Sequence, residues 1–128
     1  MQVAETHYLD NTFTFNIPPV PYRRRIAVPL IMALASGKDA KASHRLLFNG
    51  VSVAYVEANA GRINAVTGVS SFPNGSVMPS YGNFFLPESD CDSWFGVIEA
   101  NQAASIKAEA STSNGGKTPK HITVHLGV

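Results

Sequence analysis

Two short apolar runs separated by a single Asn-Gly step constrain the fold of this chain more than any other feature. The step, Asn49-Gly50, lies within residues 43–57. A type I′ turn needs two consecutive residues with positive φ, and Asn followed by Gly adopts these angles at little cost. Residues 51–56 then alternate with a period of two, as in a strand with one buried face. The sequence therefore predicts a β-hairpin here.

Similar short apolar runs, interrupted by Gly, Pro, Asn and Ser, recur along most of the chain. With 128 residues, the chain is long enough for one domain with its own core. About eight to ten short antiparallel strands at this spacing predict an all-β fold, a β-sandwich or jelly roll. Besides the hairpin, we expect strands over residues 12–17, 24–35, 62–70, 84–86, 94–98, 101–112 and 121–126.

Residues 101–112 combine helix-forming residues with a two-residue alternation. The alternation places Ala104, Ile106, Ala108 and Ala110 on one face. Because the rest of the chain is typical of strands, we interpret this segment as a strand rather than a helix.

Residues 1–22 are expected to form an extended N-terminal arm, and residues 23–128 to form the sandwich. The arm ends in Pro18-Pro19-Val20-Pro21, a stiff spacer, because prolines donate no ladder hydrogen bonds and favour an extended path. By default the arm packs on its own domain, and the alternative is that it reaches a neighbouring subunit.

The most apolar strand, 24–35, contains Pro29, which predicts either an edge strand or a β-bulge. Since both of its faces are apolar, we expect it to be covered on both sides, partly by another chain. The alternation predicts one face with Ile26, Val28, Leu30, Met32 and Leu34, and the other with Ala27, Ile31 and Ala33.

Charge and cysteine content exclude several classes of site. Ten Lys and Arg against nine Asp and Glu give a net charge of +1, with no general attraction to nucleic acid or an anionic membrane. The single cysteine, Cys91, excludes an internal disulfide and a zinc site of several cysteines. No signal peptide is expected at the N-terminus, and the run 26–35 is too short to span a bilayer.

No motif predicts catalysis, a cofactor or a metal site. The chain has no Gly-rich phosphate loop, no G-x-S-x-G elbow and no H-E-x-x-H helix. His121 and His125 share a strand face, but their Cα atoms would lie roughly 13 Å apart, too far for one ion. Glu88, Asp90 and Asp92 lack the rest of a calcium loop, so we interpret them as a solvated loop.

Three adjacent arginines follow Tyr22 and are suited to gripping phosphate or carboxylates on a partner. The alternative is a charged strand entry that discourages edge pairing. Alternation along the strand points Arg24 away from Arg23 and Arg25. The candidate partner-binding residues are Phe13, Phe15, Tyr22, Arg23, Arg24, Arg25 and Met32.

The hairpin segment 46–53 and the run Phe84-Phe85-Leu86-Pro87 resemble small β-sandwich modules of tailed-phage virions, such as capsid decoration proteins and tail-fibre tips. The resemblance covers residues 24–99, and its motifs are generic to β-sandwiches. Because the chain has no collagen-like, heptad or repeat shaft, the resemblance implies a compact decoration, hub or tip module rather than a long fibre.

This resemblance implies a virion protein made in the host cytoplasm, with no enzymatic activity and no nucleic-acid or membrane partner. It would form a homotrimer or another symmetric assembly, with strand 26–34 as the subunit interface. Its arm would contact other virion proteins of the capsid or tail.

A carbohydrate-binding sandwich is the competing interpretation. Exposed aromatic residues such as Tyr55, Tyr81 and Trp94 would stack on sugar rings beside Asn83 and acidic side chains. Alternatively, Trp94 belongs to the core. An enzyme is the least supported class, because no acid–base or nucleophile constellation is present.

Overall fold

The structure is a computed structural model that describes residues 2–10, 12–37, 39–64, 70–71, 77–78, 83–86 and 88–128. Within these residues it contains strands and no helix, as the sequence predicts. The strands are β1 (Val3–Asp10), β2 (Thr14–Ile17), β3 (Arg24–Ala35), β4 (Lys41–Phe48), β5 (Val51–Asn59), β6 (Gly61–Asn64), β7 (Ser70–Ser71), β8 (Val77–Met78), β9 (Asn83–Leu86), β10 (Glu88–Ile98), β11 (Ala104–Ser113) and β12 (His121–Gly127).

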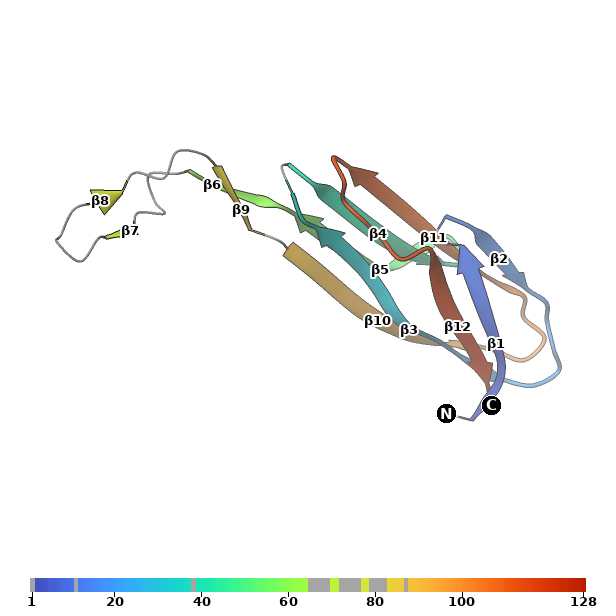
Figure 1. The fold of residues 1–128 in the computed structure, drawn as a ribbon. Coiled ribbons are helices and arrows are strands. Elements are labelled where there is room, and N and C mark those ends of the chain that lie inside the picture. Colours follow the sequence, from blue (N-terminus) through green and yellow to red (C-terminus); the bar gives the residue numbers. More distant parts are fainter. Residues whose placement is uncertain are drawn as a thin grey trace.

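Eight of these strands form two antiparallel four-stranded sheets that pack face to face (Figure 1). Sheet A has the order β1-β12-β3-β10, and sheet B has the order β2-β11-β4-β5. The pairs are nested, because β1 pairs with β12, β2 with β11, β3 with β10 and β4 with β5. This nesting is that of one long hairpin rolled up, and it gives the jelly-roll form of the β-sandwich.

An insertion between β5 and β10 carries the four remaining strands. β6 pairs with β9, and β7 pairs with β8. Figure 1 shows β6 and β9 beyond the ends of β5 and β10. β6 coincides with the start of the strand predicted over 62–70, whereas residues 65–69 lie outside the described part.

The N-terminal segment differs from the predicted arm. β1 pairs with β12 along its length, and β2 pairs with the first residues of β11. Each of the two sheets therefore includes one N-terminal strand, and the chain shows no division between an arm and a sandwich at residue 22. The structure agrees with the default expectation, in which this segment packs on its own domain.

A β-bulge interrupts β3 at Pro29. Trp94 pairs with Val28 and Asp92 pairs with Ile31, so two residues of β3, Pro29 and Leu30, lie opposite Ser93 alone. The bulge accommodates a proline in a strand that lies between β12 and β10. The bulge alternative for 24–35 is confirmed. β3 is not the edge strand of sheet A, but its register with β12 covers only Arg25, Ile26 and Ala27, so Pro29 lies in the part of β3 that pairs with β10 alone.

The bulge also reverses which residues of β3 face the core. Ile26 and Val28 are buried before it, and Ile31, Ala33 and Ala35 are buried after it. Leu30 and Leu34 are exposed, contrary to the predicted single face from Ile26 to Leu34. One extra residue shifts the phase of a period of two, so each later side chain changes face.

The predicted hairpin joins β4 and β5. Asn49 has a φ of 51° and Gly50 a φ of 80°, the two positive values of a type I′ turn. The turn is also attached to the neighbouring β11. The backbone N–H of Asn49 donates to the Ser105 carbonyl at 2.9 Å, and the Ser105 N–H donates to the Asn49 side-chain oxygen at 2.9 Å.

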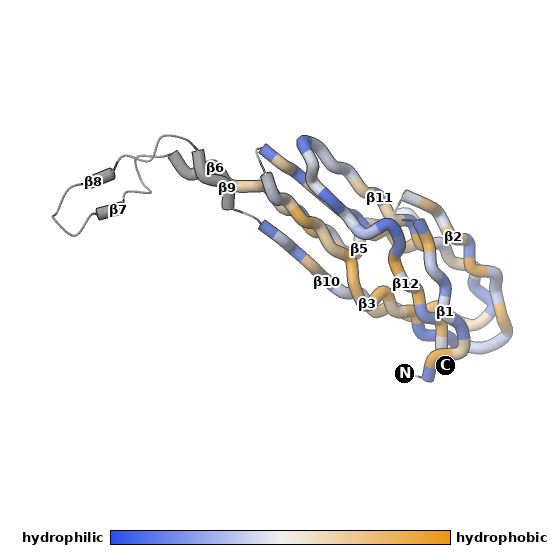
Figure 2. The backbone as a smooth tube through the Cα atoms, in the orientation of Figure 1, coloured by the Kyte–Doolittle hydropathy of each residue, from blue (hydrophilic) through white to orange (hydrophobic). Residues whose placement is uncertain are grey.

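The core lies between the two sheets and is built from alternate residues of their strands. On β11, Ala104, Ile106 and Ala108 are buried, as predicted, and Ala110 is half-buried. Figure 2 shows a long hydrophobic stretch along β3 and a hydrophilic start of β10. The largest fully buried side chains are Ile17, Ile26, Val28, Ile31, His44, Leu46, Val56, Ile106, Ile122 and Val124.

His44 is the polar member of that set. It points inward from β4, and neither ring nitrogen has a hydrogen-bond partner among the described residues. Loss of hydration lowers the pKa of His44 below its ordinary value of 6.5, and a contact with the Met32 backbone opposes this by a smaller amount. The core therefore contains an uncharged imidazole whose protonation is unfavourable.

Side chains close both edges of the sandwich. At one edge the His7 ring of β1 lies against the Phe15 ring of β2, with centroids 4.5 Å apart. At the other edge the backbone N–H of Glu57 on β5 donates to Oδ2 of Asp90 on β10, at 3.2 Å.

The turn conformation predicts the effect of substitutions at Gly50. Gly50→Ala should lower the free energy of unfolding by about 1 kcal/mol, because an L side chain is strained at this positive φ. Gly50→Asn should lose less, since Asn tolerates this region better. Urea denaturation measures both values, and equal stability of Gly50→Ala and the wild type would contradict the turn assignment.

The buried His44 predicts a pH-dependent stability. Because its pKa is lowered on folding, the unfolded chain binds the proton more tightly. Above about pH 6.5, the neutral His44 does not reduce the free energy of unfolding. Below that pH, the free energy of unfolding should fall by up to about 1.4 kcal/mol per pH unit. Urea titrations at about pH 7.5 and 5.5 should show this loss for wild type.

His44→Leu should flatten that dependence, because it removes the buried titrating group. His121→Gln, at an exposed histidine, is the matched control and should retain the wild-type dependence. A His44→Leu protein that loses as much stability as wild type over this interval would show that His44 does not cause the effect.

Candidate functional site

The outer face of sheet A exposes apolar side chains on β3 and β10. Phe95 is 68% exposed and Leu30 47% exposed, with Leu34 and Val97 also exposed. We call this surface, made by Leu30, Leu34, Phe95 and Val97, the β3–β10 face. Contiguous exposed apolar groups are typical of a protein-contact surface, and Phe95 and Val97 are such neighbours beside one hollow.

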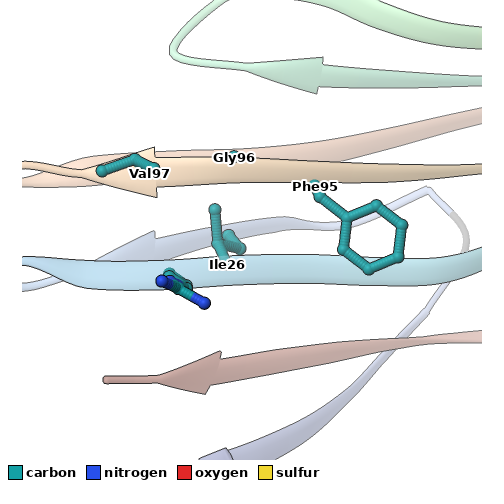
Figure 3. A pocket seen from close by; sticks show the side chains of 5 residues that line it. Ile26, Phe95, Gly96 and Val97 are labelled. Atoms are coloured by element: carbon teal, nitrogen blue, oxygen red, sulfur yellow. The ribbon is translucent and has the colours of Figure 1, made fainter. Parts of the chain in front are cut away.

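A hollow of about 390 Å³ lies at one end of the β3–β10 face (Figure 3). Phe95 and Val97 extend from β10, and Arg25 from β3, where it pairs with Val97. Ile26 is fully buried and Gly96 has no side chain, so Arg25, Phe95 and Val97 form the rim. The site thus combines an exposed aromatic ring, a hollow beside it and a cation.

The three arginines have different environments, as the alternation predicts. Arg23 lies 3.4 Å from the carboxylate of Glu99, with both side chains exposed. Arg24 is 7% exposed and donates to the Pro18 carbonyl at 2.8 Å. Arg25 is exposed. All three nevertheless border one hollow of about 330 Å³, together with Val97 and Val128, which makes this end of the β3–β10 face cationic.

The other predicted partner-binding residues are dispersed. Phe13 is exposed and lies beside Tyr8 and His121. Phe15 is half-buried, because it packs against His7. Tyr22 is exposed, and Met32 is half-buried on β3. The structure therefore brings the arginines together and places Tyr22 beside Arg24 at another hollow, whereas Phe13, Phe15 and Met32 line neither hollow.

The sugar-binding residues predicted from the sequence do not form a described site. Trp94 is half-buried and its ring lies against Phe48 of sheet B, with centroids 4.8 Å apart. The structure agrees with its alternative assignment to the core, because Trp94 packs against the core cluster. Tyr81 lies outside the described residues, and Asn83 is described only as part of the β9 backbone.

The acidic residues Glu88, Asp90 and Asp92 belong to β10 rather than to a loop, which corrects the prediction. They share a strand face with the inward-facing Trp94, yet remain exposed at the sheet edge. Inward-pointing charges on an edge strand discourage pairing with a further strand. Their place therefore favours contact through the β3–β10 face rather than through the β10 edge.

The exposed histidines have separate partners. Nδ1 of His121 lies 3.1 Å from Asp10 Oδ1, and Nδ1 of His125 lies 3.0 Å from Thr6 Oγ1. Among the described residues, no group of three or more His, Cys, Asp or Glu could hold a metal ion. Cys91 is exposed. The described part of the chain also contains no helix with the length and apolar character needed to cross a membrane.

Gly96 predicts a tightly packed junction beneath the β3–β10 face. A Cβ at this position would meet the Trp94 ring at 2.5 Å, and Phe48 limits how far that ring can move. Gly96→Ala should lower the free energy of unfolding by about 1–3 kcal/mol. It should also shift the fluorescence of Trp94, the one tryptophan of the chain. Ser93→Ala on the same strand is the control, and unchanged fluorescence and stability of Gly96→Ala would contradict this packing.

Comparisons with known protein families, with curated proteins and with solved structures found no match for this chain. Its fold class therefore follows from its own strand order, and the function of its surfaces has to be argued from their residues.

Proposed function

We propose that this protein is a structural virion protein of a tailed phage, a capsid decoration or tail-associated module that acts by symmetric self-association and contact with other virion proteins. In this proposal it has no catalytic role, and a second copy of the chain covers the β3–β10 face. A twofold homodimer, in which the same patch contacts its own copy, or a larger symmetric assembly that contains such a twofold contact, would satisfy it.

The observation that carries self-association is the neighbouring ring and hollow on the β3–β10 face. Phe95 projects from the surface beside a hollow that it borders itself. A self-complementary interface needs a projection and a matching recess on one patch, because the same patch contacts its own copy. Phe95 of one copy can fill the hollow of the other, where Arg25 would lie against its ring. Aromatic residues and Arg are the types that dominate binding energy at interfaces.

Composition and strand design support the same proposal. Charged residues make up 15% of the chain, below the roughly 25% of typical domains, which suits a surface that is partly covered. The acidic inward face of the β10 edge disfavours open-ended strand addition. Association through a sheet face is therefore favoured over growth along the edge.

The virion assignment is supported by analogy. Eight-stranded jelly rolls occur in viral capsid and lectin domains, but one fold hosts many functions. The resemblance of the hairpin and of the Phe84–Pro87 run to phage modules adds to that analogy. Neighbouring genes for capsid or tail proteins would support the assignment, whereas a gene neighbourhood of metabolic enzymes would count against it.

Self-association predicts a defined mass above that of the 13.7 kDa monomer. Size-exclusion chromatography with light scattering should show a symmetric oligomer for wild type. Phe95→Ser should shift it to the monomer, because it removes the central aromatic contact without emptying the core. The circular dichroism spectrum should not change.

Phe13→Ser is the matched control, since Phe13 is also exposed but lies away from this face. A monomeric wild type would overturn self-association. If Phe13→Ser were monomeric and Phe95→Ser remained an oligomer, the interface would lie at the N-terminal segment instead.

A further inference from the structure

The outer face of sheet B has a polar character quite unlike that of the β3–β10 face. Strand register places its outward side chains in three rows that cross β5, β4 and β11. The first row is Tyr55, Arg45 and Glu109, the second is Glu57, Ser43 and Ser111, and the third is Asn59, Lys41 and Ser113.

The middle row forms a groove because two of its members are small. Ser43 and Ser111 lie between Tyr55 on one side and Lys41 with Asn59 on the other, around a space of about 200 Å³. Pockets for drug-sized ligands have volumes of roughly 300–1,000 Å³. The groove therefore suits one small ring rather than a larger ligand.

The side chains at the β5 end of the groove are held in place before any ligand arrives. The Asn59 amide donates to Glu57 Oε1 at 2.9 Å, and the Tyr55 hydroxyl donates to Glu57 Oε2 at 3.0 Å. These two hydrogen bonds, together with nearby Lys41, lower the pKa of Glu57 and keep it ionised. The carboxylate is therefore a fixed, charged hydrogen-bond acceptor.

The Tyr55 ring is supported from one side by Arg45. The guanidinium carbon lies 4.8 Å from the ring centroid, and the same side chain donates to the Ser52 hydroxyl at 3.2 Å. Tyr55 is nevertheless 43% exposed. It supplies a rigid, partly apolar wall next to an array of hydroxyl, amide, ammonium and carboxylate groups.

We propose that this groove binds one sugar ring of a glycan, with Tyr55 against the C–H surface of the ring and Glu57, Asn59, Lys41 and the two serines bonded to its hydroxyls. A pyranose offers both kinds of surface, and hydroxyls donating to a carboxylate form short, strong hydrogen bonds. Because the charges of Glu57 and Lys41 offset each other in the lining, the groove has no net charge, which suits an uncharged sugar.

This site keeps Tyr55 from the sequence-based one and replaces Tyr81, Asn83 and Trp94 by other residues of three strands. It does not depend on self-association. The outer faces of the two sheets lie on opposite sides of the sandwich (Figure 1), so an oligomer formed through the β3–β10 face would leave the groove open to solvent.

Saturation-transfer NMR on the full chain tests the proposal with glucose, galactose, mannose, N-acetylglucosamine and, as an anionic probe, N-acetylneuraminic acid. At least one neutral sugar should bind, with a Kd in the millimolar range that is typical of weak single-ring contacts, about −4 kcal/mol. N-acetylneuraminic acid should not bind. A glycan array then identifies which neutral terminal sugar is preferred.

Three variants test whether the sugar binds in the groove. Glu57→Ala should weaken the affinity by about tenfold or more, as expected for loss of a charge-assisted hydrogen bond, and Ser111→Trp should abolish binding by filling the groove. Glu109→Ala is the matched control, because it removes a carboxylate from the same sheet face outside the groove lining, and it should bind as wild type does.

No binding of any neutral sugar in either experiment, or binding that survives Ser111→Trp, would overturn the proposal. Light scattering on the same samples separates this outcome from the proposed function, since groove variants should keep the wild-type mass.

Discussion

The β-bulge in β3 reconciles two requirements that a regular strand in its place would not meet together. β3 lies between β12 and β10; it pairs with β12 at Arg25, Ile26 and Ala27, and with β10 on both sides of Pro29, although a proline donates no ladder hydrogen bond. With Pro29 and Leu30 opposite Ser93, the missing N–H falls where the ladder is already interrupted. The extra residue also turns Ile31, Ala33 and Ala35 into the core. The exposed Leu30 and Leu34 of the β3–β10 face are the other result of that change of phase.

The elements that could be predicted from the sequence are those whose signal lies within one short segment. The bounds of β3, the type I′ turn at Asn49-Gly50 and the inward face of β11 follow from period and turn chemistry alone. β1 lacks a clear apolar alternation, because Leu9 is its one buried side chain. The three acidic residues at the start of β10 are typical of a loop when only the sequence is considered; the strand accommodates them because it lies at the edge of sheet A.

The β3–β10 face and the groove could not be predicted from the sequence, because each combines residues of strands that are far apart along the chain. Arg25 and Val97 are more than 70 positions apart and become neighbours only through the register of β3 with β10. The rows of the groove depend likewise on two registers at once. A partial signal did exist, since Tyr55, Glu57 and Asn59 alternate along one strand and so share a face. The inward direction of Trp94 is likewise not visible in its own segment, because it depends on pairing with the buried Val28 and on the Phe48 ring of the opposite sheet.

The nested pairing also determines the order in which the two sheets can form during synthesis. β12, near the end of the chain, lies between β1 and β3, and Figure 1 shows the two termini side by side. During synthesis at roughly 5–20 residues per second, Val3 would wait about 6–25 s for its partner Gly127 to be made. Until then β1 has no neighbour in its sheet and β3 has an open edge, while the β4–β5 hairpin can already form. Sheet A is therefore completed after sheet B, although β3 and β10, which form the outer face proposed for assembly, can pair before β12 is made.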